Sequence, residues 1–452
     1  MSKCTSFIVF LLVSFFLVFG CTAATLAENK SVDVKSVTST EIVGYNNGSQ
    51  GDVMIQGFVW QSSNGYNGQK WWDVLKSTSQ AVADAKFDMI WFPPCSDSGD
   101  DQGYLPREWY KFDSRYGTTA QLSDAIRAYR NKGVKVIADV VINHRVGTDN
   151  EWDFTNPDFF TDPYPNDDHK AIVSNDDCHC GTGAADTGRG YDSARDLDHT
   201  NATVRSVIKS YVSQLRTDID PTSDIALFDG FRYDMVVGYS PGYVGEYNFE
   251  CNPQPYFSVG EYMEENLDEL KDWINKTNPY GEARSALFDF ANRSGLLYAI
   301  TNGKYSALNP NSSGKAPGLI GDDYYKKYAV TFFENHDTEE SRNGANRPAF
   351  PNDQNLKAYT YILTHPGIPC VFWSDWWANQ ADINAMIAIR KETGIGRDST
   401  VNIDRATDGQ GYSAYIGSNV AMMIGSSWTP SGSVWTLRRG NPSWGWAIWT
   451  KS

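Results

Sequence analysis

Residues 134–145 read VKVIADVVINHR, an apolar run that turns polar at its end. β-Branched residues dominate this run, which is typical of a buried strand. The preceding residues, 119–132, begin with Thr and stop before Gly133, as a helix with a glycine C-cap does. The segment thus shows a helix, then a buried strand, then polar residues where the strand stops. This order predicts one repeat of an alternating β/α fold.

Seven further β-rich apolar runs lie along the chain. They occupy 53–58, 87–92, 228–235, 256–260, 286–290, 328–333 and 368–372. Helix-like stretches separate most of them, and the clearest are 71–85, 201–215 and 382–391. Eight strand–helix units over about 340 residues predict a (β/α)8 TIM barrel.

The predicted barrel is interrupted once and followed by a second domain. We expect its two parts at 50–142 and 201–394, with an inserted domain at 143–200 after the third strand. That insertion is rich in Asp, Gly, Asn and Pro. It is longer than a loop that only connects two elements, and its length predicts that it has a function. Short strands with Gly, Ser and Asn turns predict an antiparallel β domain at 395–452.

The N-terminus reads as a processing segment. Residues 1–24 carry Lys3 and then the apolar run FIVFLLVSFFLVF, thirteen residues long. A membrane-spanning helix needs about 20, so a signal peptide fits better. Two endings are open: VFGC resembles a lipobox that would lipidate Cys21, whereas TAA at 22–24 suits ordinary cleavage. Either way we expect a secreted protein or one anchored at the cell surface, with a linker or tether at 25–49.

Composition narrows the function classes. The formal charge is -16, which argues against nucleic acid and anionic membranes as partners. No later segment is apolar enough to predict a transmembrane span. The 14% of aromatic residues suits large cores, or surfaces on which sugar rings stack.

Seven cysteines are present, and Cys4 leaves with the signal peptide. Cys178 and Cys180 lie in a Cys-His-Cys run. We expect them to be too close for an easy mutual disulfide. Zinc would need more ligands nearby, so a structural or unpaired role is favoured.

Polar residues cluster where four predicted strands end. They are Asp139, Asn143 and His144; Arg232 and Asp234; Glu261; and Asn335, His336 and Asp337. Because active sites of TIM barrels lie at the C-terminal ends of the strands, these residues predict one site.

The spacing of two strand ends suggests a chemistry. Arg232 and Asp234 are two residues apart and therefore face the same side, where the guanidinium is expected to keep Asp234 ionised. Glu261 lies on the next strand, about 5 Å away. Two carboxyls at about 5–5.5 Å suit retaining glycoside hydrolysis. The apolar Val259 and Gly260 before Glu261 are expected to raise its pKa.

Taken together, these segments resemble the conserved regions of the α-amylase family (glycoside hydrolase family 13), and most of all its plant-type members. Further stretches that carry the resemblance are 55–60, 103–106, 137–145, 314–318 and 359–370. The resemblance runs from about residue 50 to the C-terminus.

The resemblance implies a role for each rim residue. Asp234 would be the nucleophile, Glu261 the acid/base and Asp337 the residue that stabilises the transition state. The supporting residues would be Arg232, which orients Asp234; His144 and His336, which hydrogen-bond the sugar; Tyr104, which stacks on it; and Asp139, paired with Arg232.

The inserted domain resembles the one that carries structural calcium, through residues 181–199. That likeness implies Ca²⁺ as the cofactor. The implied ligands are the side chains of Asn143, Asp186 and Asp196 and the backbone carbonyls of Arg189 and Gly238. All are oxygen donors, as calcium prefers.

Two pairs of residues depart from the family pattern. Tyr262 and Met263 stand where an aliphatic residue and Trp are common. Val237 and Gly238 stand where many members have a Lys-His pair that contacts the leaving-group side. Sugar binding on that side is therefore expected to differ.

The leading hypothesis is an exported, monomeric, endo-acting α-amylase that hydrolyses α-1,4 links in starch or glycogen with retention. Alternatives are an exo-acting maltooligosaccharide-forming amylase, a transglycosylase and a catalytically silent glucan-binding protein. A lesser alternative is a surface glucan site at Trp444, Trp446 and Trp449, although alternating Trp residues in a small sheet more often form core.

Overall fold

The structure is a computed structural model that describes residues 51–150, 152–160, 167–219, 226–278, 281–339 and 350–451. The predicted signal peptide and linker lie outside the described residues. Within the described part of the chain, no helix is both long and apolar enough to cross a bilayer.

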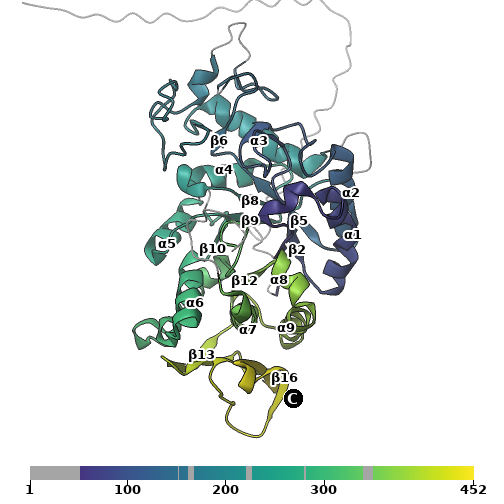
Figure 1. Cartoon of the computed structure of the whole chain (residues 1–452). Helices are drawn as coiled ribbons and strands as arrows, with labels where there is room; N and C mark the ends of the chain where they lie inside the picture. The colour runs from purple at the N-terminus through teal and green to yellow at the C-terminus, as the bar shows by residue number, and fades with distance from the viewer. Residues whose placement is uncertain are drawn as a thin grey trace, which may run out of the picture. The chain divides into compact units, whose positions relative to one another are not determined.

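Eight parallel strands close into a barrel, as predicted (Figure 1). In chain order they are β1 (Met54–Gln56), β2 (Met89–Trp91), β5 (Lys135–Val140), β8 (Gly230–Tyr233), β9 (Phe257–Gly260), β10 (Ala286–Phe288), β11 (Ala329–Thr331) and β12 (Ile368–Phe372). Each of the eight apolar runs contains one strand. The barrel closes where β1 pairs with β12, with Met54 opposite Cys370.

Helices surround the strands in Figure 1. They are α1 (Trp71–Asp84), α2 (Thr119–Arg130), α3 (Ala202–Thr217), α4 (Pro241–Glu250), α5 (Leu267–Lys276), α6 (Phe290–Asn302), α7 (Asn355–Thr364), α8 (Trp373–Ala378) and α9 (Gln380–Thr393). Local signals set their ends. Thr118 caps α2 in a capping box with Gln121, and α9 ends at Gly394 in the left-handed region.

The register of three central strands places the polar strand ends side by side. Asp139 of β5 lies opposite Arg232 of β8, and Tyr233 of β8 lies opposite Gly260 of β9. The barrel strands are almost wholly buried. A charged residue in this layer must therefore be paired, because an unpaired buried charge is costly.

The segment between β5 and α3 is built from loops, short strands and the short helix η2 (Asp167–Ala171). Strand β6 (His144–Arg145) pairs antiparallel with β7 (Arg195–Asp196). Earlier in the chain, between β2 and α2, β3 (Asp97–Ser98) and β4 (Pro106–Glu108) form a small antiparallel hairpin.

The expectation for Cys178 and Cys180 is wrong, because the two residues form a disulfide. Their Cα atoms are 5.2 Å apart, within the range that disulfides span. His179 between them has a φ of 52°, in the left-handed region, and this turn brings the two cysteines together. The other cysteines of the described chain, Cys95, Cys251 and Cys370, are buried thiols.

An antiparallel sheet follows the barrel, as predicted. Its order is β13–β14–β15–β17–β16, with β13 at Val401–Thr407, β14 at Gly411–Ile416, β15 at Val420–Gly425, β16 at Trp435–Asn441 and β17 at Trp446–Lys451. Trp446 and Trp449 are only 4% and 5% exposed, which fits their expected core role, whereas Trp444 is 64% exposed.

Candidate active site

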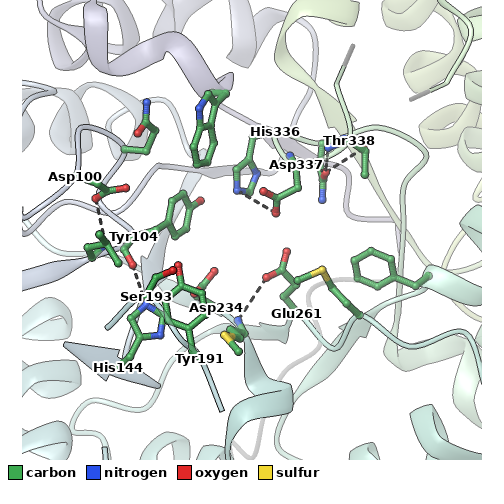
Figure 2. Close-up of a pocket in the computed structure, with 17 residues that line it drawn as sticks. Asp100, Tyr104, His144, Tyr191, Ser193, Asp234, Glu261, His336, Asp337 and Thr338 are labelled. Carbon is green, nitrogen blue, oxygen red and sulfur yellow. Dashed lines mark hydrogen bonds and ion pairs between the residues drawn. The ribbon is translucent and has the colours of Figure 1, made fainter. Parts of the chain in front are cut away.

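A pocket of about 530 Å³ opens at the C-terminal ends of the barrel strands. It brings together six of the predicted residues: Tyr104, His144, Asp234, Glu261, His336 and Asp337. Figure 2 shows Asp337 and His336 facing Glu261 across this pocket. The seventh predicted residue, Arg232, is fully buried on β8 beside the pocket.

Arg232 is the common partner of three carboxylates. Its Nη1 donates to Asp139 Oδ1 at 2.8 Å and to Asp234 Oδ1 at 2.7 Å. Its Nη2 lies 2.7 Å from Glu261 Oε1 as an ion pair. The predicted pairing of Arg232 with Asp139 and Asp234 is thus present, and Glu261 joins it.

These carboxyls are hard to ionise, mainly because they are buried. Burial raises the pKa of Asp139 to about 7, although Arg232 acts in the opposite direction. Burial also raises the pKa of Asp234, against the lowering effect of Arg232. Arg232 favours the ionised form of Asp234, as expected, but it is shared among three carboxylates and burial has the larger effect on the pKa of Asp234.

The pKa of Glu261 is raised, as predicted. Burial is the largest cause, Arg232 opposes it, and the neighbouring charge of Asp234 raises it further. Glu261 is 2% exposed yet lines the pocket, so its carboxyl can hold a proton where a ligand would bind. A protonated carboxyl beside a second carboxyl is the pattern of an acid paired with a nucleophile.

One wall of the pocket is built by Tyr104 and His144. The Tyr104 hydroxyl donates to Asp139 Oδ2 at 2.9 Å, and the Tyr104 carbonyl accepts from His144 Nε2 at 2.8 Å. His144 Nδ1 lies 3.2 Å from Asn143 Nδ2, so both ring nitrogens contact protein groups. Burial lowers the pKa of His144 to about 4, which leaves it neutral. Sugar binding by His144 stays a prediction, and it requires one of these contacts to open.

His336 and Asp337 form the adjoining part of the pocket, where the His336 ring stacks on the Tyr104 ring with centroids 5.2 Å apart. Gln56 Nε2 lies 3.1 Å from His336 Nδ1 and also donates to Phe58 O, so the amide donates and Nδ1 accepts. His336 Nε2 then carries the proton and points to Asp337 Oδ2 at 3.5 Å. Asp337 is oriented by its own backbone, since its N–H donates to Asn335 Oδ1 at 3.0 Å.

Several residues of the pocket were not among the predicted site residues. Trp60 stacks nearly parallel to Tyr104, with ring centroids 6.1 Å apart, and Tyr191 stacks on His144 at 4.1 Å. Asp100 and Met263 also line the pocket. Trp60 lies in a stretch that carried the family resemblance, but no local pattern marks it as pocket-lining.

The predicted calcium ligands lie close together between β5, the insertion and the segment after β8. Asn143 Nδ2 donates to Asp196 Oδ1 at 3.0 Å. A Cβ added at Gly238 would lie 2.0 Å from Asn143 Oδ1, so the amide oxygen faces that glycine. The Arg189 N–H donates to Val237 O at 3.0 Å, which joins the insertion to the turn that contains Gly238.

The chemistry of this donor set fits a hard cation. Asp186 Oδ2 is buried and has no hydrogen-bond partner within the described chain. Burial raises the pKa of Asp196 to about 7, and the charges of Asp186 and Asp176 add to the effect. Among the described residues, no three His, Cys, Asp or Glu side chains are arranged to hold a metal. The predicted set has only two carboxylates, and its other donors are an amide and two carbonyls, which suit calcium.

Comparison with known proteins identifies the family. Residues 80–170 match the family model described as "Alpha amylase, catalytic domain". The chain is 35% identical over 419 residues to "Probable alpha-amylase 2" of Arabidopsis thaliana, covering 88% of this chain and 94% of that protein. The chain belongs to the α-amylase family. It is therefore a glycoside hydrolase, as the resemblance implied.

Other α-amylase family relatives differ in activity. "Alpha-amylase 3, chloroplastic" of Arabidopsis thaliana is 31% identical, over 88% of this chain and 43% of that protein. The glucan 1,4-alpha-maltotetraohydrolase of Stutzerimonas stutzeri is 28% identical, over 87% of this chain and 70% of that protein. Family membership alone thus leaves the products open.

Solved structures share the fold of this α-amylase family member at low identity. An α-amylase from Geobacillus thermoleovorans, solved with acarbose, superposes with a TM-score of 0.60 at 18% identity, covering 84% of this chain and 87% of that one. A cyclomaltodextrin glucanotransferase superposes with a TM-score of 0.62 at 17% identity, covering 90% of this chain and 96% of that one. These matches show the barrel and C-terminal sheet, not the reaction.

Proposed function

We propose that this protein is an endo-acting α-amylase that hydrolyses α-1,4-glucosidic bonds in starch and glycogen with retention of configuration. The observation that carries the proposal is the buried Arg232, which contacts Asp139, Asp234 and Glu261, with Asp337 across the same pocket. Of these carboxylates, Asp234, Glu261 and Asp337 provide the nucleophile, the acid and the transition-state stabiliser that the reaction needs.

In the first step Asp234 attacks the anomeric carbon while Glu261 donates its proton to the departing glycosidic oxygen. Arg232 contacts Asp234 through Oδ1 and holds that carboxylate in place. The bond to the leaving sugar breaks as the covalent glycosyl–Asp234 bond forms.

In the second step the ionised Glu261 takes a proton from water. The resulting hydroxide attacks the same carbon and releases Asp234, so configuration is retained. Arg232 stabilises Glu261 in the interval when it is anionic, because Nη2 lies 2.7 Å from Oε1. Asp337 and His336 would bind hydroxyls of the reacting sugar, and Tyr104 would offer its ring for stacking.

Calcium is proposed as the structural cofactor, held by Asn143, Asp186, Asp196 and the carbonyls of Arg189 and Gly238. When bound, it would neutralise the buried carboxylates and tie the insertion to the barrel. Removing calcium with EDTA at constant ionic strength is expected to lower the melting temperature. An unchanged melting temperature would contradict this assignment.

Export is the proposed route for the chain, through the signal peptide at residues 1–24. N-terminal sequencing and mass spectrometry of the exported protein distinguish cleavage after Ala24 from a lipidated Cys21. Size-exclusion chromatography with light scattering tests the expected monomer.

The decisive experiment is hydrolysis of soluble starch with calcium present, comparing the wild type with Asp234→Asn. Release of α-anomeric products by the wild type, reduced at least about 10³-fold in the variant, supports the retaining mechanism. Rapid loss of iodine colour relative to reducing ends supports internal cleavage. Maltotetraose as the first product would instead favour exo action, the activity of the Stutzerimonas relative. A folded wild type that binds glucan without cleaving it would overturn the proposal.

A further inference from the structure

The hairpin between β3 and β4 carries a carboxylate for which the proposed mechanism has no role. Asp100 lies near the tip of this hairpin and lines the catalytic pocket on the same wall as Tyr104 (Figure 2). It was not among the residues that the sequence patterns singled out. Its side chain is half-buried, and its two oxygens have different surroundings.

One oxygen of Asp100 holds the hairpin tip together. Asp100 Oδ1 accepts from Ser98 Oγ at 2.5 Å, from the Gly103 N–H at 3.0 Å and from the Leu105 N–H at 3.1 Å. The two backbone donors flank Tyr104. The Tyr104 carbonyl in turn accepts from His144, so Oδ1 of Asp100 positions two pocket residues.

The other oxygen, Oδ2, makes no hydrogen bond or ion pair with the described residues. The negative charge of Asp100 nevertheless acts on the reacting centre. It contributes to the raised pKa of Asp234, and it partly opposes the lowering of the His144 pKa by burial. A carboxylate oxygen in a pocket can accept hydroxyl hydrogens, and such charge-assisted bonds are stronger than neutral ones.

We infer that Asp100 is a substrate-binding residue, in which Oδ1 fixes the Tyr104 hairpin and Oδ2 accepts hydroxyl hydrogens from a glucosyl unit of the bound glucan. This inference rests on the proposed glucan hydrolysis. It adds a carboxylate, outside the catalytic three, that binds sugar equally in the ground state and the transition state.

Two substitutions distinguish the roles of the two oxygens of Asp100. Asp100→Asn keeps an acceptor for Ser98, Gly103 and Leu105 but removes the charge that Oδ2 offers to sugar. Asp100→Ala removes both functions. The matched control is Asp101→Asn, since the neighbouring Asp101 is 52% exposed in its side chain and pairs with Arg115 at 2.7 Å.

The assay measures kcat and KM on maltoheptaose for all four proteins. Asp100→Asn is expected to raise KM about tenfold with kcat within about twofold, the signature of lost uniform binding. Asp100→Ala is expected to lower kcat as well, because Tyr104 and His144 lose their support. Asp101→Asn is expected to match the wild type.

Two results would overturn the inference. One is a KM for Asp100→Asn equal to that of the wild type. The other is a loss of kcat, at unchanged KM, that is equal in the Asn and Ala variants, which would mean a purely structural role. A wild type that does not cleave maltoheptaose or starch would instead refute the proposed function, so the two failures are distinguishable.

Discussion

Arg232 Nη2 lies 2.7 Å from Glu261 Oε1, so the guanidinium that orients the proposed nucleophile also contacts the proposed acid. Arg232 is fully buried, and its charge is opposed by two or three carboxylates according to their protonation. The cluster therefore favours retention of one proton. Glu261 is the member whose role requires that proton, and its raised pKa fits this role.

Replacing Arg232 is expected to cost both activity and stability. Arg232→Met leaves buried carboxyls without their cation, which costs about 3–5 kcal/mol in the free energy of unfolding. We expect kcat to fall at least about 10³-fold because the nucleophile and the acid lose their electrostatic support. Starch hydrolysis and urea unfolding measure the two effects. Arg115→Met is the control, since Arg115 is exposed. An active Arg232→Met enzyme would contradict the assigned role.

Asp139 links this cluster to the pH dependence of the enzyme. Its carboxylate shares the Arg232 guanidinium with Asp234 and Glu261, and so competes with them for its charge. In Asp139→Asn, the pKa values of Asp234 and Glu261 are expected to fall. Activity requires ionised Asp234 and protonated Glu261, so both limbs of the kcat/KM profile are expected to shift to lower pH. A profile that keeps its position, or a shift to higher pH, would argue against this coupling.

The proposed calcium site depends on the absence of a side chain at residue 238. A Cβ there would lie 2.0 Å from Asn143 Oδ1, whereas a Cβ at Gly242 meets its nearest neighbour at 3.8 Å. Gly238→Ala is therefore expected to weaken calcium binding at least about tenfold and to shrink the calcium-dependent rise in melting temperature. Calorimetric titration of EDTA-treated protein measures the affinity, with Gly242→Ala as the control. Unchanged affinity in Gly238→Ala would place the cation elsewhere.

The barrel and its rim were predictable because both follow strong local patterns. Each barrel strand lies within a short apolar run, and the run that contains β5 shows the sharp polar end most clearly. Because parallel strands end at one rim, Asp234, Glu261 and Asp337 could be assigned to one site without a distance. Strand β13 carries a weak local signal, because Asp404 and Arg405 interrupt its apolar alternation at the sheet edge.

Other features depend on contacts that no local pattern records. The pairing of Arg232 with Glu261 needs the register between β8 and β9. The disulfide needs the left-handed turn at His179, a rare conformation for a residue other than glycine. The hydrogen bonds of Asp100 form only once the β3–β4 hairpin has folded. Tertiary geometry decided each of these cases.

A buried histidine predicts how the fold responds to acid. His365 connects the barrel to the C-terminal sheet: its Nδ1 donates to Tyr361 O at 2.9 Å, and its Nε2 accepts from the Tyr412 hydroxyl at 2.8 Å. Burial is the largest cause that lowers its pKa to about 3, and nearby Arg390 adds to the effect. The folded protein therefore keeps His365 neutral at pH values where the unfolded chain protonates it.

The sign of the effect follows from proton binding. In the unfolded state this residue binds a proton below about pH 6.5, whereas in the folded state it binds one only near pH 3. Stability is therefore lost as the pH falls through this window. Between pH 7 and pH 5, His365 is expected to remove about 2 kcal/mol from the free energy of unfolding. Urea unfolding at both pH values measures the loss. His365→Gln cannot titrate, so its loss is expected to be smaller than that of the wild type by this amount. Burial also lowers the pKa values of His144 and His199, and these two residues contribute equally to both proteins. Identical losses in the two proteins would show that His365 is not the group whose protonation destabilises the fold.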